Sequence, residues 1–159
     1  MSTKNLTEQL EAFFDKIDLK VNKTDIKINT NHSVYTCKLE YLGFSFESSI
    51  HAFSNTRTLL VIAHLPFMIE KKVSKIIKLL TQINFGMIHG SFEYNFSNGS
   101  IQYKTSSKIF DFSQLPIIFN FLLQESGQTL QKYSEGIKIA AHTSTKNNVI
   151  IEEIESFSA

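Results

Sequence analysis

Two runs that alternate apolar and polar residues, Ser91–Phe96 and Ser100–Thr105, flank the dipeptide Asn98-Gly99. Asparagine followed by glycine favours the two-residue type I′ turn of a β-hairpin, because both residues tolerate a positive φ angle. Three aromatic residues alternate with polar residues in the first run, which gives a strand with one aromatic and one polar face. The sequence therefore predicts an antiparallel hairpin with Asn98-Gly99 as its loop.

Three further strand-like runs precede this hairpin, at Ser33–Tyr41, Phe44–Phe53 and Thr58–His64. They are rich in β-branched and aromatic residues and are separated by turn-forming residues, which predicts an antiparallel meander. We expect Pro66 to close the third strand, because proline cannot donate a ladder hydrogen bond. Together with the hairpin, the meander should form an antiparallel sheet of about five strands.

Apolar residues at helical spacing predict two helices outside these strands. The first covers residues 6–18, where Asn5 followed by Glu8 resembles a capping box. The second covers residues 69–86 and has the most regular helical period in the chain.

A third helix is predicted to begin at Ser113, to carry Pro116 in its first turn and to reach about His142. Gly127 and Gly136 weaken its continuation. One bent helix or two short helices would both fit this pattern.

The first half of the third helix, Leu115–Leu123, is apolar on nearly every side. A single packed face cannot cover all of these side chains. If the stripe that contains Phe119 packs on the sheet, Ile117 and Phe121, four residues apart, form a second stripe. Ile117 and Phe121 are therefore candidate contacts with a protein partner or a second copy, and burial of both stripes in the core is the alternative.

The predicted fold class is α+β: a three-strand meander plus a hairpin, packed with an N-terminal, a middle and a long C-terminal helix. A chain of 159 residues can bury its own core as one domain, which we place at residues 1–142. Residues 143–159 carry Lys146 and then Glu152, Glu153 and Glu155, and are expected to form a loosely ordered tail.

Charge and cysteine content exclude several classes of function. Lys and Arg number 16 against 15 Asp and Glu, a net charge of +1, so a nucleic-acid partner is not expected. There is no apolar run of membrane-spanning length and no signal-peptide pattern, so no membrane span is expected. Cys37 has no second cysteine to pair with, and we expect a cytoplasmic protein.

Patterns that carry chemistry are missing from the sequence. The five histidines lack the spacing of metal ligands, so no metal is expected. These histidines are His32, His51, His64, His89 and His142. Cys37 lies in a predicted strand as a buried side chain, there is no phosphate-binding glycine loop, and the acidic residues are scattered. We expect no catalytic residues and no cofactor.

Lys71, Lys75 and Lys78 occupy offsets 0, 4 and 7 in the second predicted helix, with Lys72 beside them. A solvated helix face explains this row. The alternative is a surface for an acidic partner or a membrane surface.

Four segments of the second half of the chain form a distinctive series: the helix end Leu79–Asn84, Gly90–Tyr94, the hairpin segment Asn98–Tyr103 and a long helix that contains Tyr133. In this series the chain resembles the YbjN family of bacterial regulators. The resemblance implies a fold like that of type III secretion chaperones, a dimer, and a role in regulation or in holding another protein. It implies no catalytic residues.

Two functions remain open after these considerations. The leading hypothesis is a non-enzymatic protein-binding module, chaperone-like or regulatory, that holds a partner or forms a homodimer. The alternative is a small-molecule or lipid binder with a phenylalanine-lined cavity between sheet and helices.

Overall fold

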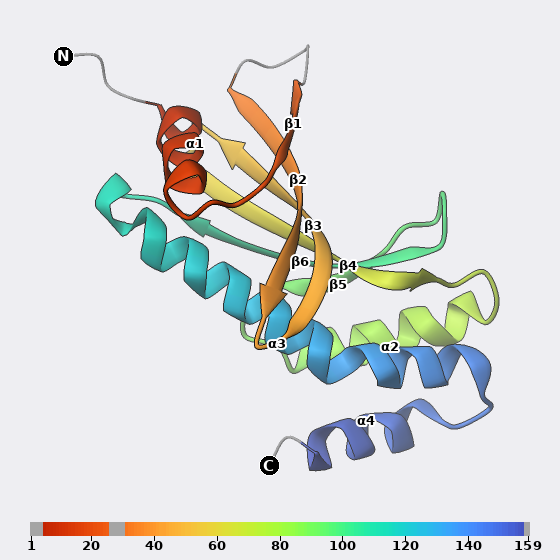
Figure 1. Ribbon diagram of the computed structural model, residues 1–159. Helices are drawn as coiled ribbons and strands as arrows, with labels where there is room; N and C mark the ends of the chain where they lie inside the picture. The colour runs from red at the N-terminus through yellow and green to blue at the C-terminus, as the bar shows by residue number, and fades with distance from the viewer. Residues whose placement is uncertain (1–4, 26–30, 158–159) are drawn as a thin grey trace.

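The computed structural model describes residues 5–25 and 31–157. Its elements (Figure 1) are, in chain order, α1 (Leu6–Lys16), β1 (Asn22–Asp25), β2 (His32–Tyr41), β3 (Phe44–Phe53), β4 (Thr58–Met68), α2 (Val73–Phe85), β5 (Ser91–Tyr94), β6 (Ser100–Lys108), the 3-10 turn η1 (Phe112–Gln114), α3 (Leu115–His142) and α4 (Asn147–Ser156). The predicted α+β class, with a meander, a hairpin and a long C-terminal helix, is confirmed.

All strands belong to one antiparallel sheet with the order β1-β2-β3-β4-β6-β5. The meander β2–β4 forms its centre, and the hairpin β5–β6 is added on the β4 side. The sheet has one strand more than the sequence predicted. This strand, β1, contains Asn22, Lys23, Thr24 and Asp25 and has no apolar alternation to reveal it.

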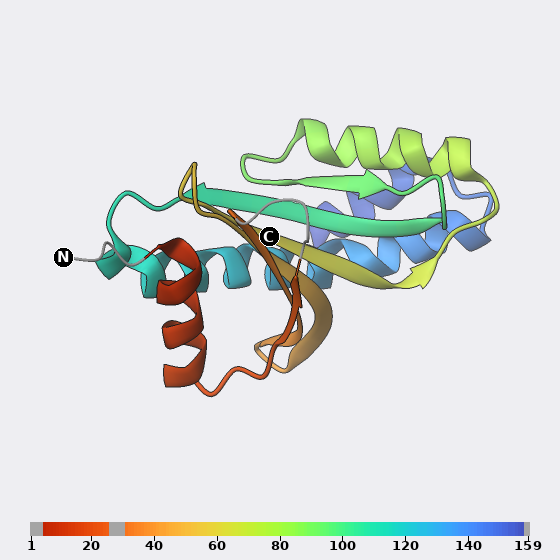
Figure 2. The same ribbon diagram turned by 90° about the horizontal axis from the view of Figure 1, so that it is seen from above.

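The helices cover one face of the sheet and one of its edges. α1 and α3 pack under the sheet, whereas α2 runs beside β5 and contacts α3, and α4 packs on α3 and α2 (Figures 1 and 2). Alternate strand residues point toward the helices and are buried, for example Tyr35, Ile50, Val61 and Tyr103. We call the opposite side, over which no helix of the described residues lies, the open face of the sheet.

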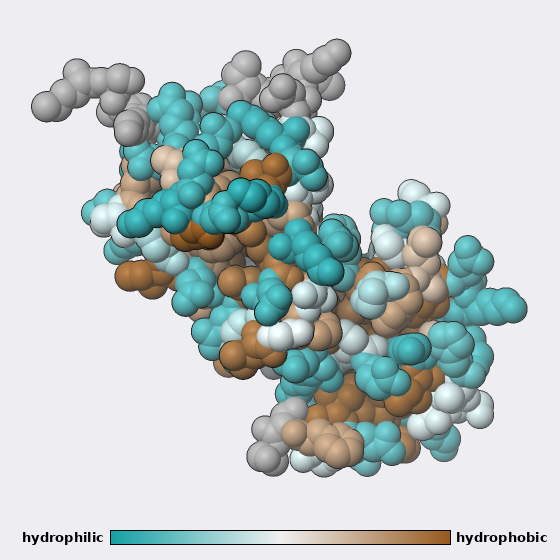
Figure 3. Space-filling view, in the orientation of Figure 1, coloured by the Kyte–Doolittle hydropathy of each residue, from teal (hydrophilic) through white to brown (hydrophobic). Residues whose placement is uncertain are grey.

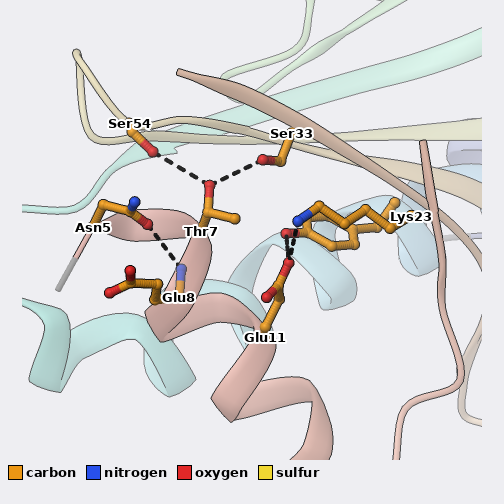
Figure 4. A network of polar contacts seen from close by, with 8 residues as sticks. Asn5, Thr7, Glu8, Glu11, Lys23, Ser33 and Ser54 are labelled. Atoms are coloured by element: carbon orange, nitrogen blue, oxygen red, sulfur yellow. Dashed lines mark hydrogen bonds and ion pairs between the residues drawn. The ribbon is translucent and has the colours of Figure 1, made fainter. Parts of the chain in front are cut away.

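Polar contacts fix α1 to the sheet (Figure 4). Thr7 Oγ1 lies 3.0 Å from Ser33 Oγ, and Glu11 Oε1 accepts hydrogen bonds from Tyr35 Oη at 2.8 Å and Lys23 Nζ at 2.7 Å. The hydrogen bond from Lys23 is the main reason why the pKa of the Glu11 carboxyl lies below its usual value.

The loop of the hairpin differs from the prediction. The last ladder pair is Tyr94↔Ile101, and Asn95 N donates to Ser100 O at 2.9 Å, so the loop has the four residues of segment 96–99. Gly99 has a φ angle of +73°, whereas Asn98 does not have a positive φ angle, so the turn is not type I′. A two-residue shift of register leaves every side chain on the same face, so the alternation cannot distinguish the two loops.

A contact outside the hairpin stabilises the observed loop. Ile69 N donates to Gly99 O at 2.8 Å, and a Cβ atom on Gly99 would lie 2.7 Å from Ile69 O. Ile69 itself precedes α2, which begins at Val73 and not at the predicted residue 69.

Pro66 does not end β4. The strand continues to Met68 through a β-bulge between His64 and Met68. The β3 ladder ends at the pair Ser48↔Ala63, so Pro66 lies where β4 has no partner on its β3 side. Proline is tolerated at such a position because no ladder bond needs its missing N–H.

The third helix is continuous over 28 residues. Gly127 and Gly136, the two residues expected to weaken the helix, are both buried where another element comes close. A Cβ atom on Gly127 would lie 2.4 Å from Tyr41 Cβ, and one on Gly136 would lie 2.3 Å from Ile154 Cδ1. The glycines therefore allow β2 and α4 to approach the helix. Ser113 is not its cap, because a 3-10 turn precedes the helix and Asp111 Oδ1 accepts from Ser113 N at 2.9 Å.

The segment after residue 142, expected to be a loosely ordered tail, contains the helix α4. Ile150 and Ile154, four residues apart, are buried, and Ile154 meets Gly136 of α3. The expectation missed this helix because the segment is short and polar apart from one apolar stripe.

The outer edge of β5 is closed by a side chain from α2. Asn84 Nδ2 donates to Phe92 O at 2.9 Å, and Phe92 N donates to Asn84 Oδ1 at 2.8 Å. The amide of Asn84 thus replaces a neighbouring strand at this residue.

Candidate partner-binding surface

The first half of α3 has the two stripes that its sequence suggests. Leu115, Phe119 and Leu122 are buried against the rest of the domain, and Ile118 is half-buried. Ile117 is 73% exposed and Phe121 is 37% exposed. Their role in binding a partner stays a prediction, but their placement leaves them accessible.

The loop between α2 and β5 extends this second stripe. The rings of Phe121 and His89 meet edge to face with centroids 5.3 Å apart, and His89 O accepts a hydrogen bond from Tyr103 Oη of β6 at 2.6 Å. The neighbouring side chain of Ile88 is 91% exposed. We call Ile88, His89, Ile117 and Phe121 the edge patch.

Sequence reasoning found the α3 half of the edge patch and missed the loop half. In the sequence, the segment from Gly86 to Gly90 is only the connection between the second predicted helix and the strand that begins at Ser91. An isoleucine between two glycines was the available signal, but only the fold brings this loop to α3.

The three lysines of the second predicted helix do not form one free row. Lys71 precedes α2, and Lys78 is exposed on it. Lys75 Nζ donates to Ala140 O at 2.9 Å and to Thr143 O at 3.0 Å, and Lys72 Nζ donates to Thr143 O at 2.7 Å.

Lys72 and Lys75 therefore bind the carbonyl groups at the C-terminal end of α3, where the helix dipole favours a positive charge. Desolvation, and to a smaller extent the charge of Lys72, lowers the pKa of Lys75. Contact of Lys71, Lys75 and Lys78 with an acidic partner stays a prediction.

Two histidines meet on the open face of the sheet. His32 Nε2 lies 3.0 Å from His51 Nδ1, and both rings stack near Phe53. Burial, with smaller effects from His32 and other cationic neighbours, lowers the pKa of His51 to about 4. Burial also lowers the pKa of His64. Within residues 5–25 and 31–157, no three His, Cys, Asp or Glu side chains form a group that could hold a metal ion.

Cys37 is buried in β2, facing the helices. Burial raises the pKa of its thiol to about 11. A thiol with this pKa carries little thiolate near neutral pH, so Cys37 is a poor nucleophile.

The phenylalanines under the sheet pack against one another. The ring centroids of Phe13 and Phe119 are 5.4 Å apart, those of Phe14 and Phe119 are 5.8 Å apart, and Phe14 meets Tyr35 at 5.4 Å. These rings form core contacts in the place where the alternative hypothesis puts a cavity.

A groove of about 410 Å³ lies between α3 and α4. Its lining includes the apolar residues Ile139, Ile154 and Phe157 beside Gly136, and polar side chains such as Lys132 and Glu153. Hydrophobic atoms are visible at the surface over these two helices in the lower part of Figure 3.

No helix in the described part of the chain is long and apolar enough to cross a membrane.

Comparisons with known proteins add one structural match. No model of a known protein family matches the chain, and no curated protein does. A chain in the crystal structure of the ExsC-ExsE complex matches with a TM-score of 0.49 and 12% sequence identity. The match covers 83% of this chain and 96% of that chain.

Proposed function

We propose that this chain is a non-enzymatic protein-binding module, chaperone-like or regulatory, of the YbjN-like type. The observation that carries the proposal is the edge patch, in which Phe121 of the second stripe of α3 contacts His89 of the loop before β5, with Ile117 of the same stripe and Ile88 of the same loop exposed. The occupant of this surface is a protein partner or a second copy of the chain.

Ile117 and Ile88 are largely exposed, whereas Phe121 is 37% exposed. Full burial of an exposed side chain of this size contributes roughly 1.5 to 3 kcal/mol, so Ile117 and Ile88 have most of this to gain and Phe121 only part of it. Large apolar side chains that cluster at a surface mark interaction sites more often than scattered ones do. Association through the edge patch would bury these side chains, and this burial would favour the associated state.

The proposal is tested by a double variant and a matched control. Ile117→Ser with Phe121→Gln removes the α3 half of the edge patch, and Val149→Ser with Phe157→Gln makes the same kind of change on and after α4. Val149, at 38% exposure, matches Phe121. Light scattering measures self-association, urea denaturation measures stability, and co-purification from the native cell measures partner binding.

We expect the edge-patch variant to lose association and to keep its cooperative unfolding, while the control variant keeps both. Global unfolding of a monomeric edge-patch variant would show that both stripes of α3 belong to the core. The protein-binding proposal would then lose its supporting observation.

The groove between α3 and α4 supports a second candidate function, the binding of a small apolar molecule or lipid. Its volume of about 410 Å³ lies in the range of small-molecule sites. A native mass spectrum of the purified protein should then show a retained ligand, which Phe157→Gln should weaken. A clean mass would leave the protein-binding function as the one to pursue.

A further inference from the structure

Strand β6 extends beyond its neighbour β5. The ladder between them covers the pairs from Tyr94↔Ile101 to Ser91↔Lys104. On its other side, β6 stays paired with β4 as far as Thr58↔Lys108. The segment Thr105–Lys108 thus has a strand on one side and no strand on the other, as the longer β6 arrow of Figure 2 shows.

The direction of the backbone groups in this segment follows from the bonds around it. Phe92 directs its N–H and C=O away from β6, toward Asn84, so its ladder partner Tyr103 directs its own groups toward β4. Ile109 N donates to Arg57 O at 2.7 Å, which fits the same alternation. Ser106 therefore directs its N–H and C=O toward the side that β5 leaves empty.

No backbone group of residues 5–25 or 31–157 pairs with Ser106 on that side. Lys108 has the same orientation, and its carbonyl oxygen has the hydroxyl of Ser107 at 3.5 Å as its hydrogen-bonding contact. Ser106 and Lys108 thus direct backbone N–H and C=O groups to a side of β6 on which no strand of the described residues pairs with them.

The loop before β5 borders this edge without pairing with it. Gly90, with a φ angle of +65°, approaches β6 closely, since a Cβ atom on it would lie 2.7 Å from Lys104 O. Between the loop and β6 lies a hollow of about 410 Å³ whose lining includes Ile88, Lys104 and Ser106. The edge patch lies beside this hollow, because His89 contacts both Tyr103 and Phe121.

We propose that an extended segment of a partner protein adds as a strand to β6 at Thr105–Lys108, in line with β5. This inference rests on the proposed protein-binding function and deepens it. Side chains of the added strand that point to the helix side would pack on Phe121 and Ile117, while its backbone would pair with Ser106 and Lys108.

Charge decides between a partner segment and a second copy. Ser106 lies on the open face between Lys104 and Lys108, since residues two apart share a face. Lys104 Nζ has Glu93 Oε1 at 3.3 Å, and Lys108 has no ion-pair partner within the described residues. Ser91 already occupies the ladder position opposite Lys104, so two copies cannot pair about Ser106. Two copies paired about Lys108 would place the two lysines opposite each other, which is unfavourable. The segment that fits carries apolar residues toward α3 and acidic residues toward the open face.

Synthetic peptides test this inference on the full chain. In the first, valine alternates with aspartate; in the second, lysine replaces aspartate; the third has the first sequence with N-methylated backbone amides. We expect the valine–aspartate peptide to bind in fluorescence anisotropy, and the other two to bind about tenfold more weakly or worse. Bound peptide should also slow the exchange of the Ser106 amide hydrogen.

Ser106→Pro and Ser106→Ala form a matched pair of variants. Proline removes the outward N–H without removing a bond to β4, so the fold should persist, and alanine keeps the N–H. Ser106→Pro should weaken peptide binding about tenfold, and Ser106→Ala should change it less than about twofold. Lys108→Glu should shift the preference toward the lysine peptide.

Failure of this inference is distinguishable from failure of the proposed function. Equal binding of the valine–aspartate peptide to both Ser106 variants, or no binding of this peptide, would overturn strand addition. Concentration-dependent dimers that Ser106→Pro abolishes would overturn the choice of partner. In each case the variant Ile117→Ser with Phe121→Gln still tests the edge patch by itself.

Discussion

Replacing Gly127 with alanine tests whether the middle of α3 depends on a close approach to β2. In a free helix this change stabilises by about 1 kcal/mol, because glycine is a poor helix former. Here the new Cβ atom would lie 2.4 Å from Tyr41 Cβ and 2.7 Å from Tyr41 Cγ. Carbon atoms at a favourable distance are about 3.5 to 4.0 Å apart, so the gap is short by more than 1 Å.

Relief of this clash requires movement of the backbone, because Tyr41 Cβ is attached directly to β2. Because the backbone itself must move, we place the cost in the upper part of the range for overpacking, at about 2 to 3 kcal/mol. After the gain in helix propensity, we expect Gly127→Ala to lower the free energy of unfolding by about 1 to 2 kcal/mol. Urea denaturation with an unchanged m-value is the measurement.

Gly136→Ala is the matched control on the same helix. Its new Cβ atom would lie 2.3 Å from Ile154 Cδ1 and 2.9 Å from Ile154 Cγ1, the outer atoms of a side chain that can change its rotamer without movement of the backbone. The loss and the gain should nearly cancel, with a net change below about 1 kcal/mol. A Gly127→Ala variant as stable as the wild type, or more stable, would refute the reasoning about Tyr41.

Three further outcomes follow from single residues. Gly99→Val should lower the free energy of unfolding by about 1 kcal/mol or more, since valine resists a positive φ angle and would meet Ile69 O; an unchanged melting temperature would contradict this. Asn84→Ala should cost about 1 to 3 kcal/mol in urea denaturation, because it leaves Phe92 N–H and C=O without their partners. The pKa of His51 is about 4 in the folded chain and 6.5 when unperturbed, so on acidification the unfolded chain takes up this proton before the folded chain does. The free energy of unfolding should therefore fall as the pH drops from 6.5 to 4. His51→Gln should make the urea midpoint depend less on pH in this range.

Local patterns predicted most of the fold because they report on faces and turns. Alternation placed Phe44–Phe53 with correct bounds, and helical spacing placed the third helix through His142. Pro66 was misjudged because its tolerance depends on which strand lies beside it, and a single sequence does not state strand order.

The candidate site was predictable only in part for the same reason. The helical wheel separates Ile117 and Phe121 from the buried stripe, but no periodicity brings His89 next to Phe121. The unused edge of β6 depends on the difference in length between two strands, and the Asn98-Gly99 signal suggested a loop that would have lengthened β5. The fate of Lys75 depends on the end of a helix that lies 65 residues away in the chain.

The bonds that join α2 to the end of α3 have a consequence for the order in which the molecule opens. Lys72 and Lys75 hold the last carbonyls of α3, and Asn147 Nδ2 at the start of α4 donates to Lys75 O at 3.0 Å. These contacts join segments that are distant in sequence, and each depends on the others being in place.

The segments that these bonds join are α2, α4 and the second half of α3. They should open as one cooperative unit, so that their amide hydrogens exchange with a common free energy. The first half of α3 packs through Phe119 on Phe13 and Phe14 of α1 and belongs to a different unit. A single helix therefore spans two units of local unfolding, and the stability of one is coupled to that of the other through the backbone of α3.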